Sequence, residues 1–486
     1  PTEPMVAKAE DFSGWYNELV EKAQLIDKRY PVKGMDVWRP YGLSVMRAID
    51  DAIRGGMSRT GHHEVEFPLL IPQGEFNREA DQIKGFGGEV YWVTKGGDND
   101  LDVPLVVRPT SETAMYPMFA LWVRSHKDLP LKIYQIVSVF RYETKQTRSF
   151  IRVRQIHFFE AHTAHADYED AERQILEDLE LTAALCEKLC IPYALHKRPD
   201  WDKFPGAHYT VAADAMLPEL KTLQIATHHH YKDNFAHAYD IRYEAPSGDR
   251  VFAHQTTYGI SERVLGAVVA VHGDDKGLML PPGVAPHQAV IVPILFKGKE
   301  GPVLEAARTL QRQLVAAGHR VHVDERDETA GFKFNDWEMR GVPIRVELGP
   351  KDVEKQQCVL VRRDNGQKSF VPLADVPKSL HDALDAYAKG LLERATATLR
   401  SNVKDVKSPE EAKNLPGIAR MGWCGDDACG KRIQDVTEKS VLGVPVDVAF
   451  GGAFDKALAL PGKGFSGSCA ACGKATTTPV HVAKTY

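Results

Sequence analysis

Residues 131–166, LKIYQIVSVFRYETKQTRSFIRVRQIHFFEAHTAHA, are rich in β-branched and aromatic residues at both ends and polar in the middle. Such residues favour strands, so the stretch predicts two strands joined by a basic loop around Glu143–Ser149, which is a β-hairpin. Arg141 ends the first arm, and Arg152 and Arg154 open the second. The predicted hairpin therefore carries three guanidinium groups near one end.

The close spacing of these arginines has two interpretations. Arginine forms planar, bidentate pairs with carboxylate and phosphate groups, so guanidinium groups that converge on a pocket suit a polyphosphate or an acyl-phosphate ligand. The alternative is a solvated ladder of cross-strand charges. The hairpin sequence alone leaves both interpretations open.

Length and composition set the class of protein. A chain of 486 residues with 43% hydrophobic and 26% charged residues is typical of a soluble globular protein with about two to four domains. The net charge of −5 excludes a uniformly basic nucleic-acid coat, so any nucleic-acid site must be a local patch. The sequence has no apolar run of about 18 residues and no charged-then-apolar leader, so we expect a cytoplasmic protein without membrane contact.

Two helices and two strands are predicted before the hairpin. Apolar residues recur at helical spacing over Asp11–Ile26 and Tyr41–Met57, and we expect the second helix to end at its glycine pair. The prolines of the strand-like Glu64–Pro72 place it at a sheet edge, which is either a dimer seam or a sheet margin. The strand Val103–Arg108 runs into RPTSET (108–113), whose hydroxyl and carboxylate groups can simply cap the next helix.

The stretch after the hairpin ends in a buried helix. The predicted elements are a helix over Tyr168–Leu189 and strands over Lys221–Ala226, Ala238–Tyr243 and Val251–Thr257. Val264–Val271 follows and is too apolar to be exposed. A buried cation needs an anionic partner, so Arg263 at the start of this helix pairs either with a ligand phosphate or with a carboxylate such as Glu262.

Helices and strands alternate beyond residue 284. We predict strands over 289–295, 319–324 and 342–348, helices over 305–317 and 331–340, and further strands over 358–362 and 369–373. This βαβαβ order is typical of a compact α/β domain. A long polar helix over Lys378–Asn402 then connects this domain to the last segment.

Four of the seven cysteines form two close pairs in that segment, Cys424 with Cys429 and Cys469 with Cys472. Two such pairs joined by a longer loop have the spacing of a tetrahedral Cys₄ zinc site. A closed shell of four thiolates leaves no open position, so the metal would be structural rather than catalytic. The alternative is a cluster of buried thiols without a metal.

Together these stretches resemble class II aminoacyl-tRNA synthetases, and more closely the prolyl-tRNA synthetases of the archaeal and eukaryotic type, over essentially the whole chain. Three motifs in order carry the resemblance: FPLLIP (67–72), FRYE with IRVR (140–143 and 151–154), and GISER (259–263). The family-specific stretches are RPTSET (108–113), EAHTAHA (160–166), HGDDKGLMLPP (272–282), residues 332–351, the C-terminal cysteines and the final Lys-Thr-Tyr.

The resemblance implies an α/β chain of three domains. They are a class II catalytic domain with an antiparallel sheet (1–283), an α/β anticodon-binding domain (284–400) and a small zinc-binding α/β domain (401–486). It implies that ATP and L-proline give prolyl-adenylate with Mg²⁺, and that the prolyl group passes to tRNA(Pro). It also implies a homodimer. The bacterial form has an editing domain after the hairpin, and because only a helix and a few strands fit there in this chain, we expect no editing in cis.

The resemblance also implies roles for individual residues. The implied catalytic groups are Arg141, Glu143 and Arg263, and the implied proline-binding groups are Thr110, Glu112, Arg141, His162 and His229. The implied ATP-binding groups are Arg141, Arg152, Val153, Gln224, Thr227, Ser261 and Arg263. Glu338, Arg345 and Lys351 match anticodon-reading positions, Cys424, Cys429, Cys469 and Cys472 match metal ligands, and Tyr486 matches a residue near the active site. The amine of proline needs an acceptor, so the functional interpretation of Glu112 outweighs the helix cap.

Two departures from the family pattern concern the pocket. Where the family usually has Gly-Thr before the pocket histidine, this chain has ATHHH (226–230). We expect Ala226 to add a methyl group and His228 an imidazole near the substrate, and so to alter discrimination against proline analogues. Ile156 stands where class II enzymes often place an aromatic residue that stacks on adenine.

Two other functions remain open from the sequence. A non-catalytic paralogue could sense tRNA or an amino acid, but it would be expected to lose an ATP-binding arginine or the anticodon domain, and both are present. A synthetase for another amino acid, such as threonine, would use a catalytic metal. No cysteine lies in the segments assigned to the pocket, although His162, His165 and residues 228–230 keep such a metal conceivable.

Overall fold

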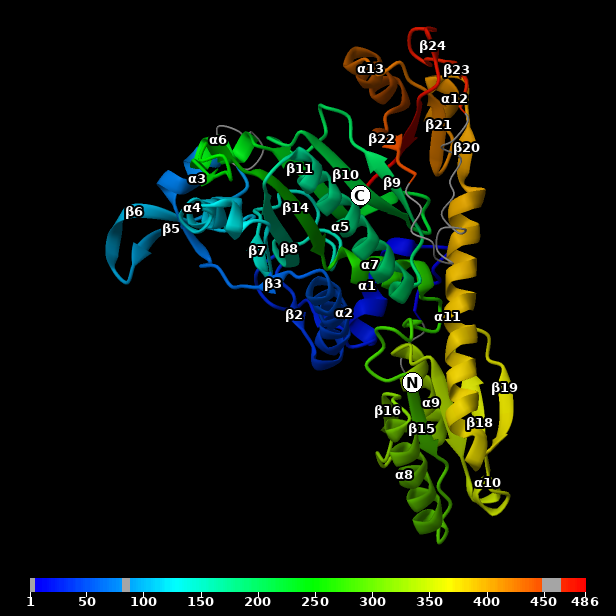
Figure 1. The fold of residues 1–486 in the computed structure, drawn as a ribbon. Helices are drawn as coiled ribbons and strands as arrows, with labels where there is room; N and C mark the ends of the chain where they lie inside the picture. Colours follow the sequence, from blue (N-terminus) through cyan, green and yellow to red (C-terminus); the bar gives the residue numbers. More distant parts are fainter. Residues whose placement is uncertain (1–4, 81–87, 448–464) are drawn as a thin grey trace.

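The computed structural model describes residues 5–80, 88–447 and 465–486. Figure 1 shows a large unit built on a sheet, an α/β unit at its lower right and a small unit at its upper right. The 26-residue helix α11 (Val376–Ser401) runs along one side and joins the two smaller units. None of the helices in the described part of the chain is long and apolar enough to cross a membrane.

An 11-stranded sheet runs through the large unit and continues into the small one. In spatial order its strands are β20 (Val403–Asp405), β21 (Ile418–Gly422), β25 (Pro479–Ala483), β22 (Ser440–Pro445), β9 (Tyr193–Lys197), β10 (Tyr209–Met216), β11 (Thr222–Lys232), β14 (His254–Ser261), β8 (Gln155–His165), β7 (Leu131–Phe140) and β3 (His63–Glu64). Neighbouring strands are antiparallel from β21 to β7, and the outermost pairs, β20 with β21 and β3 with β7, are parallel.

The predicted hairpin is confirmed as β7 and β8. They pair antiparallel from Leu131 with Ala164 to Phe140 with Gln155. The second strand begins at Gln155, later than the sequence suggests, because Arg154 bonds through its backbone N–H to Gly34 rather than to β7. All the arginines of the hairpin therefore lie in or beside its loop.

Helices cover one face of the sheet. α5 (Tyr168–Leu189) packs on β8, β11 and β14, and α7 (Arg263–His272) packs on β11 and β14. α2 (Pro40–Arg59) then packs on α5, and α1 (Phe12–Lys22) packs on α7. The main hydrophobic core lies in these layers, and the apolar α7 is buried in it as predicted.

Smaller elements surround the edge of the sheet formed by β7 and β3. They comprise the sheet β4 (Leu70–Pro72), β6 (Asn99–Val107) and β5 (Tyr91–Gly96), the hairpins β1 (Ile26–Asp27) with β2 (Val37–Trp38) and β12 (Arg242–Glu244) with β13 (Arg250–Phe252), and the helices α3 (Gln73–Ala80), α4 (Glu112–Trp122), η1 (His126–Asp128) and α6 (Asn234–Tyr239).

Three sequence predictions in this region are wrong in detail. α2 continues through its glycine pair to Arg59, because Gly56 faces α5, where an added Cβ would lie 3.0 Å from Leu181 Cδ2. The predicted strand over 64–72 is split into the ends of β3 and β4, since proline cannot donate to a sheet. The predicted strand over 238–243 is the end of α6 followed by β12, because the apolar face of α6 is buried.

The α/β unit confirms the predicted alternation. Its strands, in spatial order, are β16 (Val321–Val323), β15 (Ala289–Pro293), β17 (Ile344–Leu348), β18 (Gln357–Arg362) and β19 (Lys368–Pro372). Its further elements are α8 (Glu300–Ala316), α9 (Ala330–Met339), α10 (Pro350–Glu354) and η2 (Leu373–Asp375). β15, β16 and β17 are parallel, as crossover helices require, and β18 and β19 are antiparallel.

The small unit adds to the large one instead of standing apart. Its elements besides the sheet strands are α12 (Pro409–Lys413), α13 (Asp427–Thr437), β23 (Gly467–Ser468) and β24 (Ala475–Thr476). β22 pairs with β9, and the end of the chain lies along the start of β11, where Thr222 N–H bonds to Lys484 O at 2.9 Å. The C-terminus therefore lies beside the middle of the large sheet (Figure 1).

Candidate functional site

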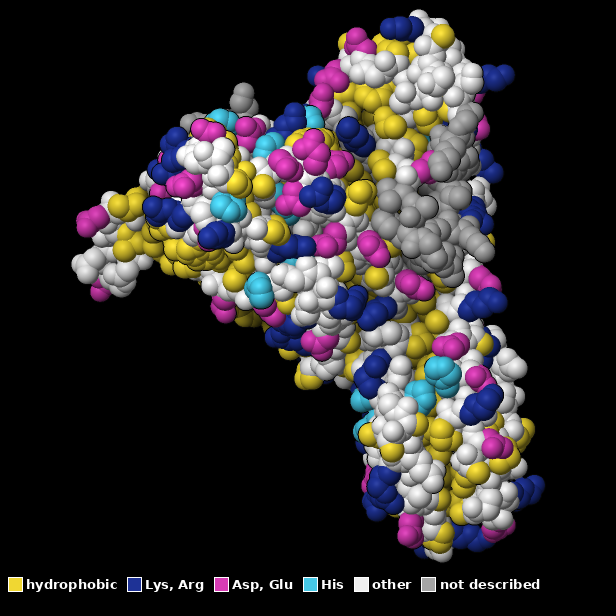
Figure 2. Space-filling model, viewed as in Figure 1, with side chains coloured by type: hydrophobic (Ala, Val, Ile, Leu, Met, Phe, Trp, Pro, Cys, Tyr) yellow, Lys and Arg dark blue, Asp and Glu magenta, His cyan; other side chains and the backbone are white. Residues whose placement is uncertain are grey.

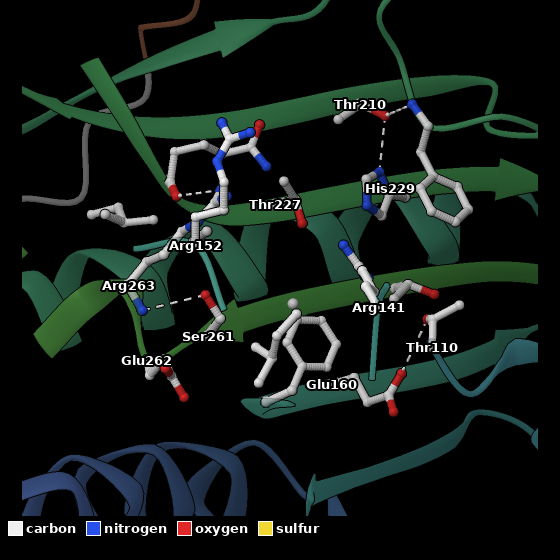
Figure 3. A pocket seen from close by; sticks show the side chains of 18 of the residues that line it. Thr110, Arg141, Arg152, Glu160, Thr210, Thr227, His229, Ser261, Glu262 and Arg263 are labelled. Carbon is white, nitrogen blue, oxygen red and sulfur yellow. Dashed lines mark hydrogen bonds between the residues drawn. The ribbon is translucent and has the colours of Figure 1, made fainter. Parts of the chain in front are cut away.

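A cavity of about 510 Å³ lies on the face of the central sheet opposite α5 and α7. Its lining comes from the hairpin loop, from β8, β10, β11 and β14, and from the start of α7. Figure 3 shows Arg152 and Arg263 at one side, which we call the arginine end, and Thr110 and Glu160 at the other, which we call the carboxylate end. Arg141 points from the carboxylate end toward the centre.

Two guanidinium groups that line the cavity bond to backbone oxygens. Arg263 Nε donates to Ile151 O at 2.9 Å, and Arg141 Nε donates to Pro109 O at 3.1 Å. Arg152 lies 3.6 Å from Glu143, which lines the same cavity. Because a neutral carbonyl holds Arg263 in place without cancelling its charge, the arginine end attracts an anion.

The environment of Arg263 is unusual for a cation. Burial, reinforced by the nearby charges of Arg141 and Arg152, lowers the pKa of Arg263 to about 10. No carboxylate in the described part of the chain lies within ion-pair distance of it. Glu262 instead accepts a hydrogen bond from His157 N–H at 2.8 Å, and burial raises the pKa of Glu262 to about 8. Of the two partners considered for Arg263, this geometry disfavours Glu262 and favours an anionic ligand.

Of the three arginines that the sequence analysis singled out in the hairpin, only Arg141 and Arg152 line the cavity. Arg154 does not line it: Arg154 Nε donates to Glu143 O at 3.0 Å, and its guanidinium group stacks on Tyr142 at 4.4 Å. Arg263 from α7 takes the third place beside Arg141 and Arg152. Residues from two distant motifs thus make the cationic surface that the hairpin alone suggested.

The carboxylate end is organised around Glu160 on β8, a residue that the sequence analysis missed. Glu160 is fully buried and accepts hydrogen bonds from Gln135 Nε2 at 3.0 Å, from His162 Nε2 at 3.0 Å and from the hydroxyl of Ser111. Burial alone would raise the pKa of Glu160, but these hydrogen bonds outweigh it and hold that pKa below its usual value. Against burial, Glu160 in turn raises the pKa of His162.

Thr110 and Glu112 face this end and do not cap the helix. Ser111 is the N-cap residue of α4 and makes no side-chain cap bond. Thr110 Oγ1 donates to Glu112 Oε2 at 2.5 Å, and Tyr231 OH donates to Glu112 Oε1 at 3.2 Å. Both Thr110 and Glu112 line the cavity, so the structure favours the functional interpretation of this stretch.

The two histidines expected in the pocket differ in their exposure to the cavity. His229 lines the cavity. Its Nδ1 shares a hydrogen bond of 2.9 Å with Thr210 Oγ1, and its ring lies against Phe204 with ring centroids 4.6 Å apart. Burial, with help from His228 and His162, lowers the pKa of His229 to about 3, so its ring is neutral. His162 lies beneath Glu160 and orients it.

Other predicted residues complete the lining. Val153, Gln224, Thr227 and Ser261 all line the cavity, as does Ile156. Phe158, two residues from Ile156 on the same face of β8, supplies an aromatic surface that the sequence analysis missed. The signal was available, because Phe158 stands at even spacing from both Ile156 and Glu160 along one strand.

The expectation for His228 is wrong, whereas Ala226 is among the residues that line the cavity. Side chains alternate along β11, so Thr227 faces the cavity while His228 lies on the opposite face. There His228 bonds to Thr182 at 2.9 Å and stacks on Tyr258. Ala226 both packs in the main hydrophobic core and lines the cavity. The histidine run therefore does not bring an extra imidazole to the substrate.

The candidate anticodon residues lie in the α/β unit, far along the chain from the cavity. Glu338 on α9 and Arg345 on β17 line one hollow, in which Lys276 Nζ lies 3.4 Å from Glu338. Arg345 stacks on Phe334 at 4.2 Å and bonds to Glu347. Lys351, on α10, lies outside this hollow.

The four predicted metal ligands come together at the top of the small unit. The sulfur atoms of Cys424, Cys429, Cys469 and Cys472 all lie within 4.8 Å of one another. The Sγ atoms of Cys424 and Cys472 are 3.9 Å apart, close to the edge of about 3.8 Å expected for a tetrahedron with Zn–S bonds of about 2.3 Å. The residues present fit a zinc ion.

Tyr486 reaches the hairpin loop from the end of the chain. Its hydroxyl accepts a hydrogen bond from Arg148 Nη1 at 3.1 Å, and its ring lies beneath the guanidinium group at 5.4 Å. Arg148 exchanges both backbone hydrogen bonds with Arg152 at 2.8 Å. Tyr486 therefore supports the loop that carries Arg152, without lining the cavity itself.

Matches to family models cover three parts of the chain. Residues 91–272 match the class II tRNA synthetase core domain (G, H, P, S and T), residues 288–382 match an anticodon binding domain, and residues 409–486 match the prolyl-tRNA synthetase C-terminal domain. Proline–tRNA ligases of Thermococcus kodakarensis and Pyrococcus abyssi are 53% and 51% identical to the chain, over 98% of both partners in each case.

Solved structures agree with these matches. The prolyl-tRNA synthetase of Giardia lamblia, in complex with prolyl-adenylate, is 36% identical, with a TM-score of 0.91 over 99% of this chain and 100% of that one. The enzyme of Cryptosporidium parvum, complexed with halofuginone and AMPPNP, is 31% identical, with a TM-score of 0.92 over 100% of this chain and 98% of that one. By its sequence, its three matched domains and its fold, the chain belongs to the prolyl-tRNA synthetase family of class II aminoacyl-tRNA synthetases.

Proposed function

We propose that this chain is a proline–tRNA ligase, which activates L-proline with ATP and transfers the prolyl group to tRNA(Pro). The observation that carries the proposal is the single cavity with opposite ends. Its arginine end suits the triphosphate of ATP, and its carboxylate end suits the positively charged amine of proline. The two relatives named above are proline–tRNA ligases and align along nearly their whole length.

The geometry suits an attack of the proline carboxylate on the α-phosphate of ATP. A bond forms between a carboxylate oxygen of proline and the α-phosphorus, and the bond between the α-phosphorus and the pyrophosphate leaving group breaks. Arg141, between the two ends, is placed to contact both reacting anions, while Arg152 and Arg263 take the negative charge that grows on the phosphates. Mg²⁺ bound with ATP would neutralise further phosphate charge, and Glu143 offers it a carboxylate.

Proline is held at the other end by its amine. Glu112 and Thr110 are the acceptors we assign to it, with His229 closing the side of the pocket. Gln224, Thr227, Ser261 and the backbone at Val153 are assigned to ATP. Because Glu160 is already saturated by its neighbours, its role is to hold Ser111 and His162 in place.

The direct test is amino-acid-dependent exchange of pyrophosphate into ATP, with purified protein and Mg²⁺ and without tRNA. We expect exchange with proline and not with the other amino acids. Exchange with none of them would favour a non-catalytic paralogue, and exchange with another amino acid would overturn the assignment of Thr110 and Glu112. Charging of tRNA(Pro) then tests the second step.

For tRNA, we assign anticodon reading to Glu338 and Arg345, with Lys351 as a nearby backbone contact. Arginine reads guanine edges by paired hydrogen bonds, and the hollow beside Phe334 offers stacking for an unpaired base. Arg345→Ala should raise the KM for tRNA(Pro) in charging and leave proline-dependent exchange without tRNA unchanged. A fall in both reactions would argue against this assignment.

A homodimer is proposed from an exposed hydrophobic surface. Figure 2 shows hydrophobic side chains gathered over β5, β6 and α4, next to the first motif. Exposed members of this surface are Leu69, Leu70, Trp92, Val103, Leu121 and Trp122, each at least 38% exposed. A patch of this kind on a folded chain marks an interface. Analytical ultracentrifugation should give twice the mass of one chain, and Leu121→Glu should lower it.

We propose a structural zinc ion at the four cysteines. Metal analysis should find about one zinc per chain, and Cys472→Ser should remove it. The four thiolates would fill its coordination shell, so the metal would stabilise the small unit and supply no open site for chemistry. A chain that folds with the same thermal midpoint after zinc removal would contradict this role.

Three units, 1–283, 284–400 and 401–486, are proposed as the catalytic, anticodon-binding and zinc-binding parts. Between β8 and β11 the chain forms only α5, β9 and β10, so there is no room for an editing domain in that segment. Hydrolysis of alanyl-tRNA by the purified protein would contradict this. We expect the protein in the cytoplasm, where aminoacyl-tRNA is used.

A further inference from the structure

A line of buried polar side chains runs from the C-terminal unit to the cavity. It begins at His481 on β25, passes through His196 on β9 and Asp214 on β10, and reaches Arg198, which follows β9. Arg198 lines the cavity, and its side chain is only 7% exposed. The line ends at Gln224 on β11, a lining residue that we assign to ATP.

Short hydrogen bonds fix each member of this line. His481 Nδ1 and His196 Nε2 are 2.9 Å apart, and His196 Nδ1 lies 2.6 Å from Asp214 Oδ2. Arg198 Nη2 donates to Asp214 Oδ1 at 2.8 Å, while its Nη1 donates to Leu442 O on β22 at 2.8 Å. The guanidinium group is therefore clamped by one strand of the catalytic unit and one strand of the C-terminal unit.

The contact with Gln224 has a direction. Arg198 Nη2 lies 2.9 Å from Gln224 Oε1. A guanidinium group has donors and no acceptors, so Gln224 must present its oxygen to Arg198. Its amide nitrogen is then turned away from Arg198, and both N–H donors are left for an oxygen-rich ligand in the cavity. The orientation of a glutamine amide is set by its hydrogen-bond network, and here Arg198 sets it.

We propose that Arg198 is a positioning residue for ATP, which holds the Gln224 amide with its donors toward the nucleotide and is itself held by the C-terminal unit. This inference rests on the proposed function. Neither the family motifs nor the arginine-rich hairpin indicated Arg198, which lies in KRPDW (197–201), a stretch without a recognisable motif. The C-terminal unit thereby contributes to nucleotide binding through Leu442 and His481, in addition to the contact of Tyr486 with the hairpin loop.

The first test is Arg198→Lys, measured by proline-dependent exchange of pyrophosphate into ATP. Lysine keeps the charge beside Asp214 but cannot reach three acceptors at once. We expect the KM for ATP to rise about tenfold, which corresponds to one hydrogen bond to a charged group, while the KM for proline stays within about twofold. Equal changes in both KM values, or none in the KM for ATP, would overturn the proposal.

The matched control is Arg363→Lys. Arg363 is also buried, pairs with the carboxylate of Asp274 at 2.5 Å and donates to the carbonyl of Glu338 at 3.0 Å, but it lies in the joint between the large unit and the α/β unit. The same chemical change there should leave the KM for ATP within about twofold in exchange without tRNA. A tenfold rise in this variant as well would mean that loss of a buried arginine, and not its contact with Gln224, weakens ATP binding.

A double-mutant cycle separates positioning from a merely structural role. Gln224→Ala removes the side chain at a half-buried position and should raise the KM for ATP by itself. If Arg198 acts through Gln224, then Arg198→Lys will have no further effect on the KM for ATP in the Gln224→Ala background. Additive effects would overturn the proposal in favour of a direct contact between Arg198 and ATP. Because Gln224→Ala leaves the bonds among His481, His196, Asp214 and Arg198 in place, its own effect remains measurable if Arg198→Lys fails to fold. An unchanged KM for ATP in Gln224→Ala would also overturn the proposal.

The outcomes also separate this inference from the proposed function. If the unaltered chain shows no proline-dependent exchange, the proposed function fails. If it shows exchange and Arg198→Lys retains the original KM for ATP, only the role of Arg198 fails.

Discussion

The two ends of the cavity hold their charges in opposite ways. At the arginine end, Arg263 bonds to a backbone carbonyl, and no carboxylate in the described chain lies within ion-pair distance of it. At the carboxylate end, Glu160 takes hydrogen bonds from three side chains, and Glu112 takes one from Thr110 and one from Tyr231. The buried Arg263 therefore has no carboxylate of the described residues within ion-pair distance, whereas the buried carboxylates of the other end are hydrogen-bonded before a ligand arrives.

This difference indicates how each end works. Buried cations without an anionic partner disfavour the empty state, as the lowered pKa of Arg263 shows, so a polyphosphate gains from entering. A carboxylate network that is fully hydrogen-bonded costs less free energy to bury than unpaired carboxylates, and it is rigid. It can therefore discriminate among small amino acids by their size and by the position of their amine. The arginine end should therefore control the rate of the reaction, and the carboxylate end the choice of amino acid.

The largest effect is expected at the arginine end. Arg263→Lys keeps a charge but loses the planar guanidinium group that bonds to Ile151 O and that we assign to the phosphates of ATP. We expect the kcat of pyrophosphate exchange to fall by about 10²–10³, comparable to removal of one donor that stabilises transition-state charge. The KM for proline should change little. A rise in the KM for proline with kcat intact would mean that the two ends are not separate.

The next largest effect is expected for Glu112→Gln at the carboxylate end. The amide has nearly the same shape but loses the negative charge that the proline amine needs. Hydrogen bonds to charged groups contribute about 1.5–3 kcal/mol, so the KM for proline should rise about tenfold to a hundredfold. Steady-state exchange at varied proline and at varied ATP measures the two KM values. A larger change in the KM for ATP than in the KM for proline would contradict this division of roles between the two ends of the cavity.

The carboxylate end should also be sensitive to pH. The pKa of His229 is about 3 in the folded protein and near its usual value of about 6.5 in the unfolded chain. Below about pH 6.5 the unfolded chain therefore binds more protons at His229 than the folded chain does. The contribution of the neutral His229 to stability is complete above that pH and is lost as the pH falls toward 3. Between pH 6.5 and pH 5, His229 should lower the free energy of unfolding by about 1.5 kcal/mol, and His229→Gln should abolish that decrease.

Urea unfolding at these two pH values measures that change. The exposed His63 on β3 gives the control, since His63→Gln removes a histidine that is not buried and should leave the slope as it was. An equal change of slope in both variants would mean that burial at the carboxylate end does not cause the pH dependence.

The elements that the sequence predicted well are those with a strong local pattern. The arms of the hairpin, the amphipathic α5 and the apolar α7 all follow from period and composition. The four cysteines were predictable because their ligand spacing is local on each side of the site. These features depend on residues close together in the chain.

The carboxylate end was harder to predict because its contacts are not local. Glu160 meets Ser111 and Gln135, which are 49 and 25 residues away in the chain. Arg198 depends on Leu442, 244 residues away. Only the pairing of distant strands brings these groups together, and no composition signal marks it. The family resemblance supplied the ligand-facing residues but not the residues behind them.

The smallest effect is expected for Ala226→Gly. The sequence alone suggested that Ala226 narrows the pocket. Ala226 does line the cavity, but it is buried and packs in the main hydrophobic core. Restoring glycine should therefore leave the relative kcat/KM for proline and its analogues unchanged, within about twofold. It should cost about 1–2 kcal/mol of unfolding free energy, because glycine gains backbone freedom and a buried methyl group is lost. Thr227→Val, one residue along, removes a hydroxyl group that faces the cavity and should raise the KM for ATP without altering the core. If Ala226→Gly changes analogue selectivity, then the Ala226 methyl group helps to set the size of the pocket, and the hydrogen bonds of the carboxylate end do not determine selectivity alone.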